Sequence, residues 1–303
     1  MEGSIPVIAG CTASGKSAAA CRLAEMFPRI EIVSADSRQL YRGMDIGTAK
    51  PSREEQARIP HHMIDIADPD VLLSAGWFAD ASMKVIEDVL SRGSIPLVVG
   101  GSALYAMHLA GLADNLPERN DSIREALCIL EDQVSGSLHR ILEGLDPEEA
   151  GNVGSRDRVR LMRSIEIALQ SRGLPSKLKK GGQHDRRLRF AILETGNREL
   201  RHRIEKRTAD MIASGLVDEV RNLLKAGVPE DPVMSSTIGY AEIIDYLRGG
   251  CSLEEAVERI SVNTWRYARR QRNMFRRLPG AVKVAGDPDR LAEVLFKERN
   301  SNG

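Results

Sequence analysis

The residues with the clearest potential for chemistry lie in the stretch GCTASGKS at residues 10–17. This stretch fits the pattern G-x-x-x-x-G-K-[ST], in which glycines let the backbone wrap around phosphate groups. Successive N–H groups and a helix N-terminus then point at negative charge. Lys16 would add a mobile positive charge, and Ser17 a hydroxyl for Mg²⁺. The residues that we expect to form this phosphate-binding loop are Gly10, Thr12, Ala13, Ser14, Gly15, Lys16 and Ser17.

A carboxylate that could act beside this loop is Asp36, which ends the apolar segment EIVSAD at residues 31–36. In ATPases and GTPases with such a loop, a neighbouring strand ends in an Asp that helps to hold Mg²⁺. Here the segment IPLVVGG at residues 95–101 ends in two glycines instead. Asp36 therefore suits a general base that meets an incoming nucleophile. The alternative is that Asp36 caps the segment that follows it.

A second chemical feature is a cluster of arginines in a predicted helix near the C-terminus. At about 100° per residue these arginines share an arc of about 120°, and a largely apolar side lies opposite. No acidic residue lies between Arg266 and Arg277 to balance them. Because arginine suits phosphate backbones, we favour contact with nucleic acid over a merely solvated helix face. The arginines of this face are Arg266, Arg269, Arg270, Arg276 and Arg277.

Two further pairs of residues could contribute to a site. Arg203 and Arg207 are four residues apart in a predicted helix, so both could reach the phosphate site as a clamp. Surface salt bridges along the helix are the alternative. His61 and His62 are adjacent, which is a poor spacing for two ligands on one regular element. We favour a structural role for the histidines over metal binding.

The elements that must position these residues follow from the hydrophobic pattern. Four short apolar segments predict buried strands, and helical patterns separate the first three. Such alternation is typical of an α/β fold with a parallel sheet and flanking helices. Ligands in these folds bind beyond the carboxyl ends of the strands, where Gly10, Asp36 and Gly100 all fall. The predicted strands are residues 5–10, 31–36, 95–101 and 188–194.

The segment 113–185 differs from the rest, because it has helical patterns and no convincing strand. We expect a helical insertion domain there, which leaves a core domain of residues 1–112 and 186–303. Beyond residue 195 the chain is again predicted to be helical. Residues 197–227 form one helix or two, and another helix follows in which Ser252 and Glu255 have the spacing of a capping box.

The composition bears on the size of the core, on nucleic-acid binding, on the redox compartment and on membrane segments. The chain of 303 residues is 42% hydrophobic, which is enough for a full core. Its 43 basic and 43 acidic residues give no chain-wide basic field, so a nucleic-acid surface must be local. The four cysteines lack CxxC spacing, as is typical of free thiols in a reducing compartment. With no signal peptide and no apolar stretch long enough to span a bilayer, we expect a cytoplasmic protein that does not bind membranes.

Taken together, these motifs resemble the tRNA dimethylallyltransferase family (tRNA isopentenyltransferases) of bacterial type. The stretch SADSRQLYRGMDIGTAKP at residues 34–51 is its most specific part. The resemblance implies a P-loop NTPase-like core and transfer of a dimethylallyl group from dimethylallyl diphosphate. The acceptor is the exocyclic N6 amine of the adenosine just 3′ of the anticodon in tRNA, Mg²⁺ is used, and diphosphate is released. The other matching stretches are GCTASGKS, PHHMIDI (60–66), GGSALY (100–105), DRVRLMRSIEI (157–167), LRHRIEKR (200–207), GLVDEV (215–220), IGYAE (238–242) and YARRQRNMFRR (267–277).

The resemblance also implies roles for individual residues. The 10–17 loop would hold the prenyl diphosphate, and Asp36 would be the hydrogen-bond acceptor or general base for the adenine amine. On physical grounds we expect loop N–H groups, Lys16, Mg²⁺ at Ser17 and Arg203 to stabilise the leaving group. Ser102 stands where the family usually has Thr, and its hydroxyl would lie near the reacting centre. The insertion would close over the anticodon stem-loop, and we expect a monomer. With the arginine face included, the expected tRNA contacts are Asp36, Ser37, Arg38, Gln39, Ser102, Arg158, Val159, Arg160, Arg266, Arg269 and Arg270.

Three other functions stay open at this point. An adenylate isopentenyltransferase would use the same donor on free AMP, ADP or ATP, although the insertion and the arginine helix favour tRNA. A small-molecule kinase would hold ATP in the loop, with Asp36 serving an acceptor hydroxyl. A non-catalytic RNA-binding protein would have no need for Lys16, Ser17 and Asp36 to converge.

Overall fold

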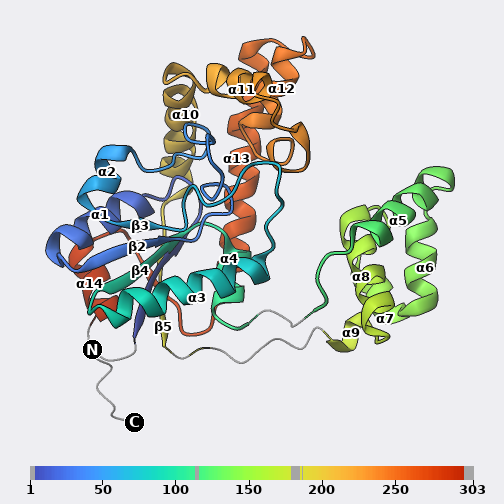
Figure 1. Ribbon diagram of the computed structural model, residues 1–303, viewed down its shortest axis with the longest axis horizontal. Coiled ribbons are helices and arrows are strands. Elements are labelled where there is room, and N and C mark those ends of the chain that lie inside the picture. The colour runs from blue at the N-terminus through green and yellow to red at the C-terminus, as the bar shows by residue number, and fades with distance from the viewer. Residues whose placement is uncertain (1–3, 113–115, 179–184, 186, 297–303) are drawn as a thin grey trace. The chain divides into compact units, whose positions relative to one another are not determined.

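The computed structural model describes residues 4–112, 116–178, 185 and 187–296 (Figure 1). Its centre is a six-stranded sheet in the order β3-β2-β4-β1-β5-β6, in which all strand pairs are parallel. The predicted α/β fold with a parallel sheet and flanking helices is confirmed. The strands are β1 (Ile5–Gly10), β2 (Ile30–Ser34), β3 (His61–His62), β4 (Ile95–Gly100), β5 (Leu188–Leu193) and β6 (Val282–Val284).

The four predicted strands correspond to β1, β2, β4 and β5, but the two edge strands were not predicted. The expectation that the chain beyond residue 195 is helical was wrong at β6, where Val284 pairs with Leu193 of β5. A strand of three residues is too short to show an alternating pattern. It forms because β5 offers a free edge and because Val284 is buried in the core.

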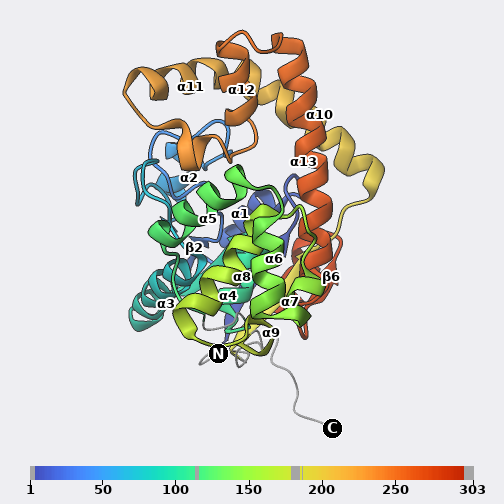
Figure 2. The same cartoon turned by 90° about the vertical axis from the view of Figure 1, so that its right-hand side faces the viewer.

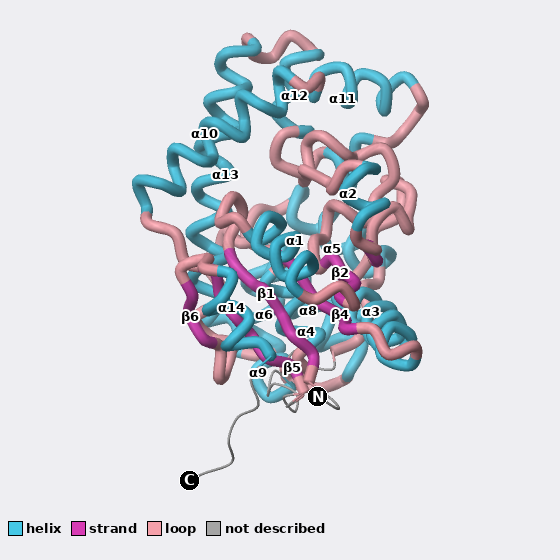
Figure 3. The backbone as a smooth tube through the Cα atoms, turned by 90° about the vertical axis from the view of Figure 1, so that its left-hand side faces the viewer, coloured by secondary structure: helices cyan, strands magenta, loops and turns pink. Residues whose placement is uncertain are grey.

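Helices cover both faces of the sheet. On one face α1 (Lys16–Met26) and α14 (Pro288–Phe296) pack against each other and against the strands (Figure 3). On the other face lie α3 (Ala75–Ser91) and α4 (Ala103–Leu109), and the short α2 (Arg53–Arg58) precedes β3. The core between the sheet and α1 with α14 includes Ile8, Leu23, Ile32, Leu97, Leu193, Leu291 and Leu295.

A group of helices lies beyond the carboxyl ends of the strands (Figures 1 and 2), where α10 and α12 both pack against α13. The predicted helical region 197–227 is two helices, because Gly215 between them adopts a φ of 99°, which favours glycine. The predicted capping box of Ser252 and Glu255 begins α13. In the part of the chain that the structure describes, no helix is long and apolar enough to cross a membrane. These helices are α10 (Asn197–Ala213), α11 (Leu216–Lys225), α12 (Tyr240–Leu247) and α13 (Leu253–Phe275).

The chain forms two compact units, of which the first is Met1–Ala110 with Asp185–Gly303 and the second is Gly111–His184. In the described part of the second unit, all regular elements are helices, and they pack around a core of their own. That core includes Leu127, Leu138, Leu142, Leu161 and Ile165. The helices are α5 (Asp121–Gln133), α6 (Ser137–Leu145), α7 (Pro147–Asn152), α8 (Arg158–Ser171) and α9 (Pro175–Leu178).

Candidate active site

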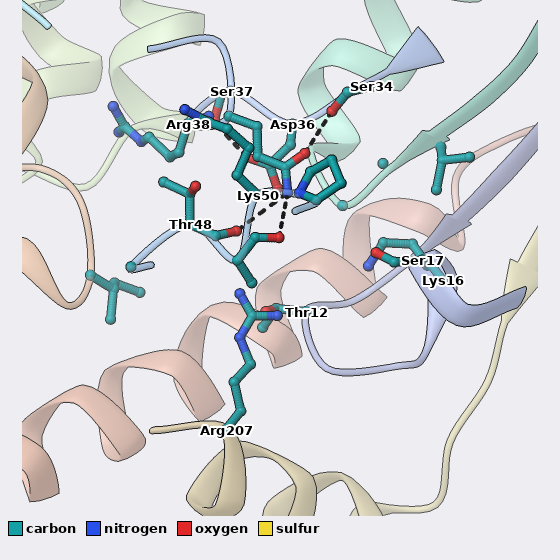
Figure 4. A pocket seen from close by; sticks show the side chains of 18 of the residues that line it. Thr12, Lys16, Ser17, Ser34, Asp36, Ser37, Arg38, Thr48, Lys50 and Arg207 are labelled. Carbon is teal, nitrogen blue, oxygen red and sulfur yellow. Dashed lines mark hydrogen bonds between the residues drawn. The ribbon is translucent and has the colours of Figure 1, made fainter. Parts of the chain in front are cut away.

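A cavity of about 590 Å³ lies where β1, β2 and β4 end (Figure 4). Lys16 and Ser17 line one side of it, and Asp36, Ser37 and Arg38 line another. The sequence predicts that Gly10, Asp36 and Gly100 share one crevice, and of these Asp36 and Gly100 line the cavity while Gly10 does not. Its apolar lining includes Ala20, Ile32, Val99, Ile204, Met211 and Ile260. The cavity thus combines a polar region with room for an apolar group.

The phosphate-binding loop turns tightly between β1 and α1. Ala13 and Gly15 adopt positive φ values of 59° and 95°, so the chain reverses just before α1 begins at Lys16. Gly10 has no room for a side chain, because an added Cβ would lie 2.8 Å from the Oγ of Ser14. These residues and Ser14 build the backbone of the loop, while its cavity-lining side chains are Thr12, Lys16 and Ser17.

Lys16 is a desolvated cation in the lining of the cavity. Its Nζ donates to the backbone carbonyl of Cys11 at 2.8 Å. Burial lowers the pKa of the Lys16 ammonium to about 8, while Cys11 and Asp36 raise it and Arg207 lowers it further. A buried cation of this kind is stabilised by an anionic ligand, which restores the electrostatic interactions lost with water.

Asp36 follows β2 and is fixed by a local turn. Its Oδ1 accepts the backbone N–H of Arg38 at 2.9 Å. The same carboxylate interacts electrostatically with Lys16 and Arg207. Asp36 thus closes a turn, as expected of a residue that caps the next segment, and it also lines the cavity, as a general base would require.

The two arginines of α10 lie in different surroundings. Arg203 donates to the carbonyl oxygen of Ser14 at 3.2 Å and pairs with Glu199, and it does not line the cavity. Arg207 extends from α10 into the cavity (Figure 4). Burial lowers the pKa of its guanidinium, and Asp36 opposes that effect. The i, i+4 spacing identified both as candidates but could not say that Arg207 is the one that faces the cavity.

Ser102 lies beside the cavity rather than in its lining. Its Oγ accepts the backbone N–H of Tyr105 at 3.4 Å and caps α4. Its own N–H donates to the carbonyl oxygen of Ala35 at 3.4 Å. Gly100, two residues before Ser102, lies directly against the carbonyl group of Ala35, since an added Cβ would lie 2.1 Å from its oxygen. Ser102 therefore contacts the segment that carries Asp36.

Gln271 of α13 connects the phosphate-binding loop to the end of β4. Its Oε1 accepts the backbone N–H of Thr12 at 2.8 Å, and its Nε2 donates to the carbonyl oxygen of Gly101. Gln271 is buried. The sequence carried no signal for its polar role, because its partners are distant along the chain.

The arginine face of α13 is exposed, as its charge pattern indicated. Arg270 lines the cavity, whereas Arg266 and Arg269 do not. Arg38 contributes at another wall, where its Nη2 donates to the carbonyl oxygen and hydroxyl of Ser236 at 3.3 and 3.2 Å.

The remaining predicted site residues fall into two groups. Ser37 and Gln39 line the cavity, and the Nε2 of Gln39 donates to backbone carbonyl oxygens of a neighbouring loop. The second unit contains the others, at the start of α8, where Arg158 pairs with Asp132 and Arg160 with Asp157. Val159 between them is 66% exposed.

The two histidines hydrogen-bond near the edge of the sheet. The Nε2 of His62 lies 2.7 Å from a carboxylate oxygen of Glu31, and the Nδ1 of His61 lies 2.7 Å from the carbonyl oxygen of Ile59. His61 also lines the cavity.

The donors at the cavity fit Mg²⁺ that is shared with a phosphate ligand. Mg²⁺ prefers oxygen ligands and is commonly held by one or two protein groups together with substrate phosphates. Ser17, which the sequence predicts as the residue that offers a hydroxyl to Mg²⁺, lines this cavity. Among residues 4–112, 116–178, 185 and 187–296, no group of three or more His, Cys, Asp or Glu could hold a metal ion. A single protein hydroxyl therefore fits an ion whose other ligands come from a bound phosphate group and water.

The fold and the cavity define an α/β protein of the P-loop class, with a carboxylate facing the phosphate-binding loop. The family is narrower than that class: residues 39–278 match the family model described as IPP transferase, and the chain belongs to this family. The resemblance seen in the sequence is confirmed.

Relatives of the chain cover nearly all of it. It is 42% identical to the tRNA dimethylallyltransferase of Kosmotoga olearia, over 93% of this chain and 91% of that protein. It is 44% identical to the tRNA dimethylallyltransferase of Geobacter metallireducens, over 89% of each.

The chain is also similar to solved structures of transferases with related names. The tRNA delta(2)-isopentenylpyrophosphate transferase of Staphylococcus epidermidis is 32% identical, with a TM-score of 0.68 over 97% of both chains. A eukaryotic dimethylallyltransferase acting on tRNA is 27% identical, with a TM-score of 0.76 over 97% of this chain and 76% of that one.

Proposed function

We propose that this protein transfers the dimethylallyl group of dimethylallyl diphosphate to the N6 amine of an adenosine beside the anticodon of tRNA. The C–O bond of the donor breaks, an N–C bond forms, the amine loses a proton, and diphosphate leaves. The observation that carries the proposal is that the phosphate-binding loop and Asp36 face one cavity. The family of the chain and the names of its relatives support the same reaction.

On the donor side, the chain's cations would stabilise the leaving group. Lys16 and Arg207 both line the cavity and would interact with the charge that develops on the diphosphate. Mg²⁺, held by Ser17 and the diphosphate, would supply further neutralisation of that charge. Arg203 would act less directly, because it braces the loop at Ser14.

On the acceptor side, Asp36 would hold the amine and take its proton. An exocyclic adenine amine is a weak nucleophile, so it must be placed in line with the allylic carbon and relieved of its proton. The adenosine must also leave the stack of the anticodon loop, at a cost of a few kcal/mol. The turn from Asp36 to Arg38 would fix the carboxylate for this step.

Contacts with tRNA would extend from the cavity to its surroundings. Ser37, Arg38 and Gln39 would contact the acceptor nucleotide, with Ser102 close behind them. The exposed face of α13, with Arg266, Arg269 and Arg270, would contact the phosphate backbone. In the second unit, the start of α8 at Arg158, Val159 and Arg160 would contact tRNA further from the reacting centre. We propose that the chain acts as a monomer.

The test is to offer labelled dimethylallyl diphosphate and Mg²⁺ with bulk tRNA, with AMP, or with no acceptor. We expect label in tRNA alone. Label in AMP instead would identify an adenylate isopentenyltransferase. Hydrolysis of ATP without any prenyl transfer would identify a different use of the phosphate-binding loop and would overturn the proposal.

A further inference from the structure

The carboxylate of Glu219 is a meeting point for four hydrogen-bond donors. Glu219 lies in the first turn of α11 and does not line the cavity. Its Oε2 accepts the backbone N–H groups of Asp45 and Ile46 at 3.0 and 2.7 Å. Its Oε1 accepts the N–H of Gly47 at 3.2 Å and the hydroxyl of Tyr240 at 2.5 Å. One side chain thus joins a loop near residue 46 to α11 and α12.

This arrangement is strong because all four donors meet one carboxylate. Hydrogen bonds to a charged group are roughly twice as strong as neutral ones. Burial raises the pKa of Tyr240, and Glu219 raises it further, so the hydroxyl keeps its proton and donates. Without the carboxylate, three consecutive backbone N–H groups would lose their partner at once, and each loss is costly where water cannot replace it.

The loop that Glu219 holds becomes a wall of the cavity. We call residues 45–51 the cavity-wall loop, because its five residues from Gly47 to Pro51 all line the cavity. From the inner side, the Nε2 of Gln39 donates to the carbonyl oxygens of Thr48 and Ala49 at 3.3 and 3.0 Å. The cavity-wall loop is therefore fixed between Glu219 outside and Gln39 inside.

The backbone of the cavity-wall loop needs such support. An added Cβ at Gly47 would lie 2.3 Å from the Cε2 of Tyr240, so the loop lies directly against that ring. Ala49 adopts a φ of 49°, in the left-handed region that costs a non-glycine residue energy. The surrounding hydrogen bonds must compensate for this conformation.

We propose that Glu219 is a positioning residue, which holds the cavity-wall loop against the segment from Asp36 to Gln39 and thereby shapes the place of the acceptor nucleotide. This inference rests on the proposed function. Glu219 itself lines no part of the cavity, so it would act through Thr48, Ala49 and Gln39. The phosphate-binding loop lies on another side of the cavity, so the donor should be affected little.

The test compares Glu219→Ala, Glu219→Gln and Tyr240→Phe with the unmodified chain in steady-state prenyl transfer. For Glu219→Ala we expect kcat/KM for tRNA to fall about 100-fold, as for a reacting group displaced by about 1 Å, while KM for dimethylallyl diphosphate changes less than about twofold. The kcat/KM of Glu219→Gln for tRNA should lie between the values of Glu219→Ala and the unmodified chain. The amide keeps one acceptor oxygen but sets an NH₂ group against other donors. Tyr240→Phe keeps all three N–H bonds and the ring against Gly47, so its loss should be the smallest.

Asp218→Ala is the matched control, since Asp218 directly precedes Glu219 in α11 and pairs with Arg221 on the surface. It should behave like the unmodified chain. Hydrogen exchange of the full chain supplies a second readout: in Glu219→Gln, faster exchange should be confined to the amides of residues 45–47.

Two results would overturn the inference. One is an equal rise of KM for donor and tRNA, and the other is faster exchange spread through the strands, since either would mean that Glu219 supports the whole unit. If the unmodified chain transfers no prenyl group to tRNA, the proposed function fails instead. Exchange at residues 45–47 still reports whether Glu219 holds the loop.

Discussion

At the scale of single residues, the charge of Lys16 sets a pH dependence. Burial lowers the pKa of its ammonium from an ordinary 10.5 to about 8 in the protein without ligand. Between these two values the unfolded chain binds more protons at this site than the folded chain. The contribution of Lys16 to the free energy of unfolding therefore rises with pH across that window. Below pH 8 the folded protein carries a buried charge, which a diphosphate would stabilise.

We therefore expect KM for dimethylallyl diphosphate to rise as pH increases above about 8, approaching tenfold per pH unit. Lys16→Arg should weaken donor binding at every pH but remove this dependence, because a guanidinium stays charged. The measurement is donor KM from about pH 7 to about 9.5 for both proteins. The same slope in Lys16→Arg would assign the titration to another group.

A second residue-scale prediction separates the two arginines of α10. Arg207→Ala should lower the single-turnover transfer rate by about 10²- to 10³-fold, as expected when one donor to a developing charge is removed. Arg203→Ala is the matched variant one helical turn away, and it should lose far less, because Arg203 contacts the loop at the carbonyl of Ser14. A larger loss in Arg203→Ala than in Arg207→Ala would reverse the assignment.

At the scale of elements, α13 holds the phosphate-binding loop through Gln271. The side-chain amide joins Thr12 to Gly101, so it ties the loop after β1 to the end of β4. Because both contacts are made by a buried side chain, a substitution leaves unsatisfied backbone groups as well as a looser loop.

Gln271→Leu should weaken donor binding about tenfold or more and lower the free energy of unfolding by about 1–3 kcal/mol. Asn273→Ala, at an exposed position of the same helix, is the control and should change neither quantity. Donor affinity and urea unfolding are the measurements. Unchanged donor affinity in a destabilised Gln271→Leu protein would show that α13 supports the fold without setting the loop.

The order of most helices and strands could be predicted from local patterns, but the side-chain contacts between distant parts of the chain could not. The continuous apolar runs of β1, β2, β4 and β5 show as buried parallel strands, and the glycine pattern shows the phosphate-binding loop. The hydrogen bond between Thr12 and Gln271 joins residues 259 positions apart in the chain, and the hydrogen bond between Gly47 and Glu219 joins residues 172 positions apart. No local pattern encodes such pairings, so the role of Gln271 and the choice between Arg203 and Arg207 needed the structure.

At the scale of the whole molecule, each compact unit has its own core and its own candidate contacts with tRNA. The larger unit contains the cavity and the exposed arginine face of α13, and the smaller contains the start of α8. Because charge is balanced over the chain, binding of tRNA should depend on these local surfaces and weaken with added salt. Removal of the proton from the amine, in contrast, should depend on the single carboxylate of Asp36.

The most direct measurement is therefore single-turnover prenyl transfer to tRNA by Asp36→Asn, with tRNA affinity measured on the same protein. Asparagine can still accept the N–H of Arg38 that Oδ1 accepts at 2.9 Å, so the turn should persist while the base is lost. We predict a fall in the transfer rate of at least about 10²- to 10⁴-fold with tRNA affinity nearly unchanged. Transfer at close to the unmodified rate would contradict the account, because the cavity would then not use Asp36 as its base.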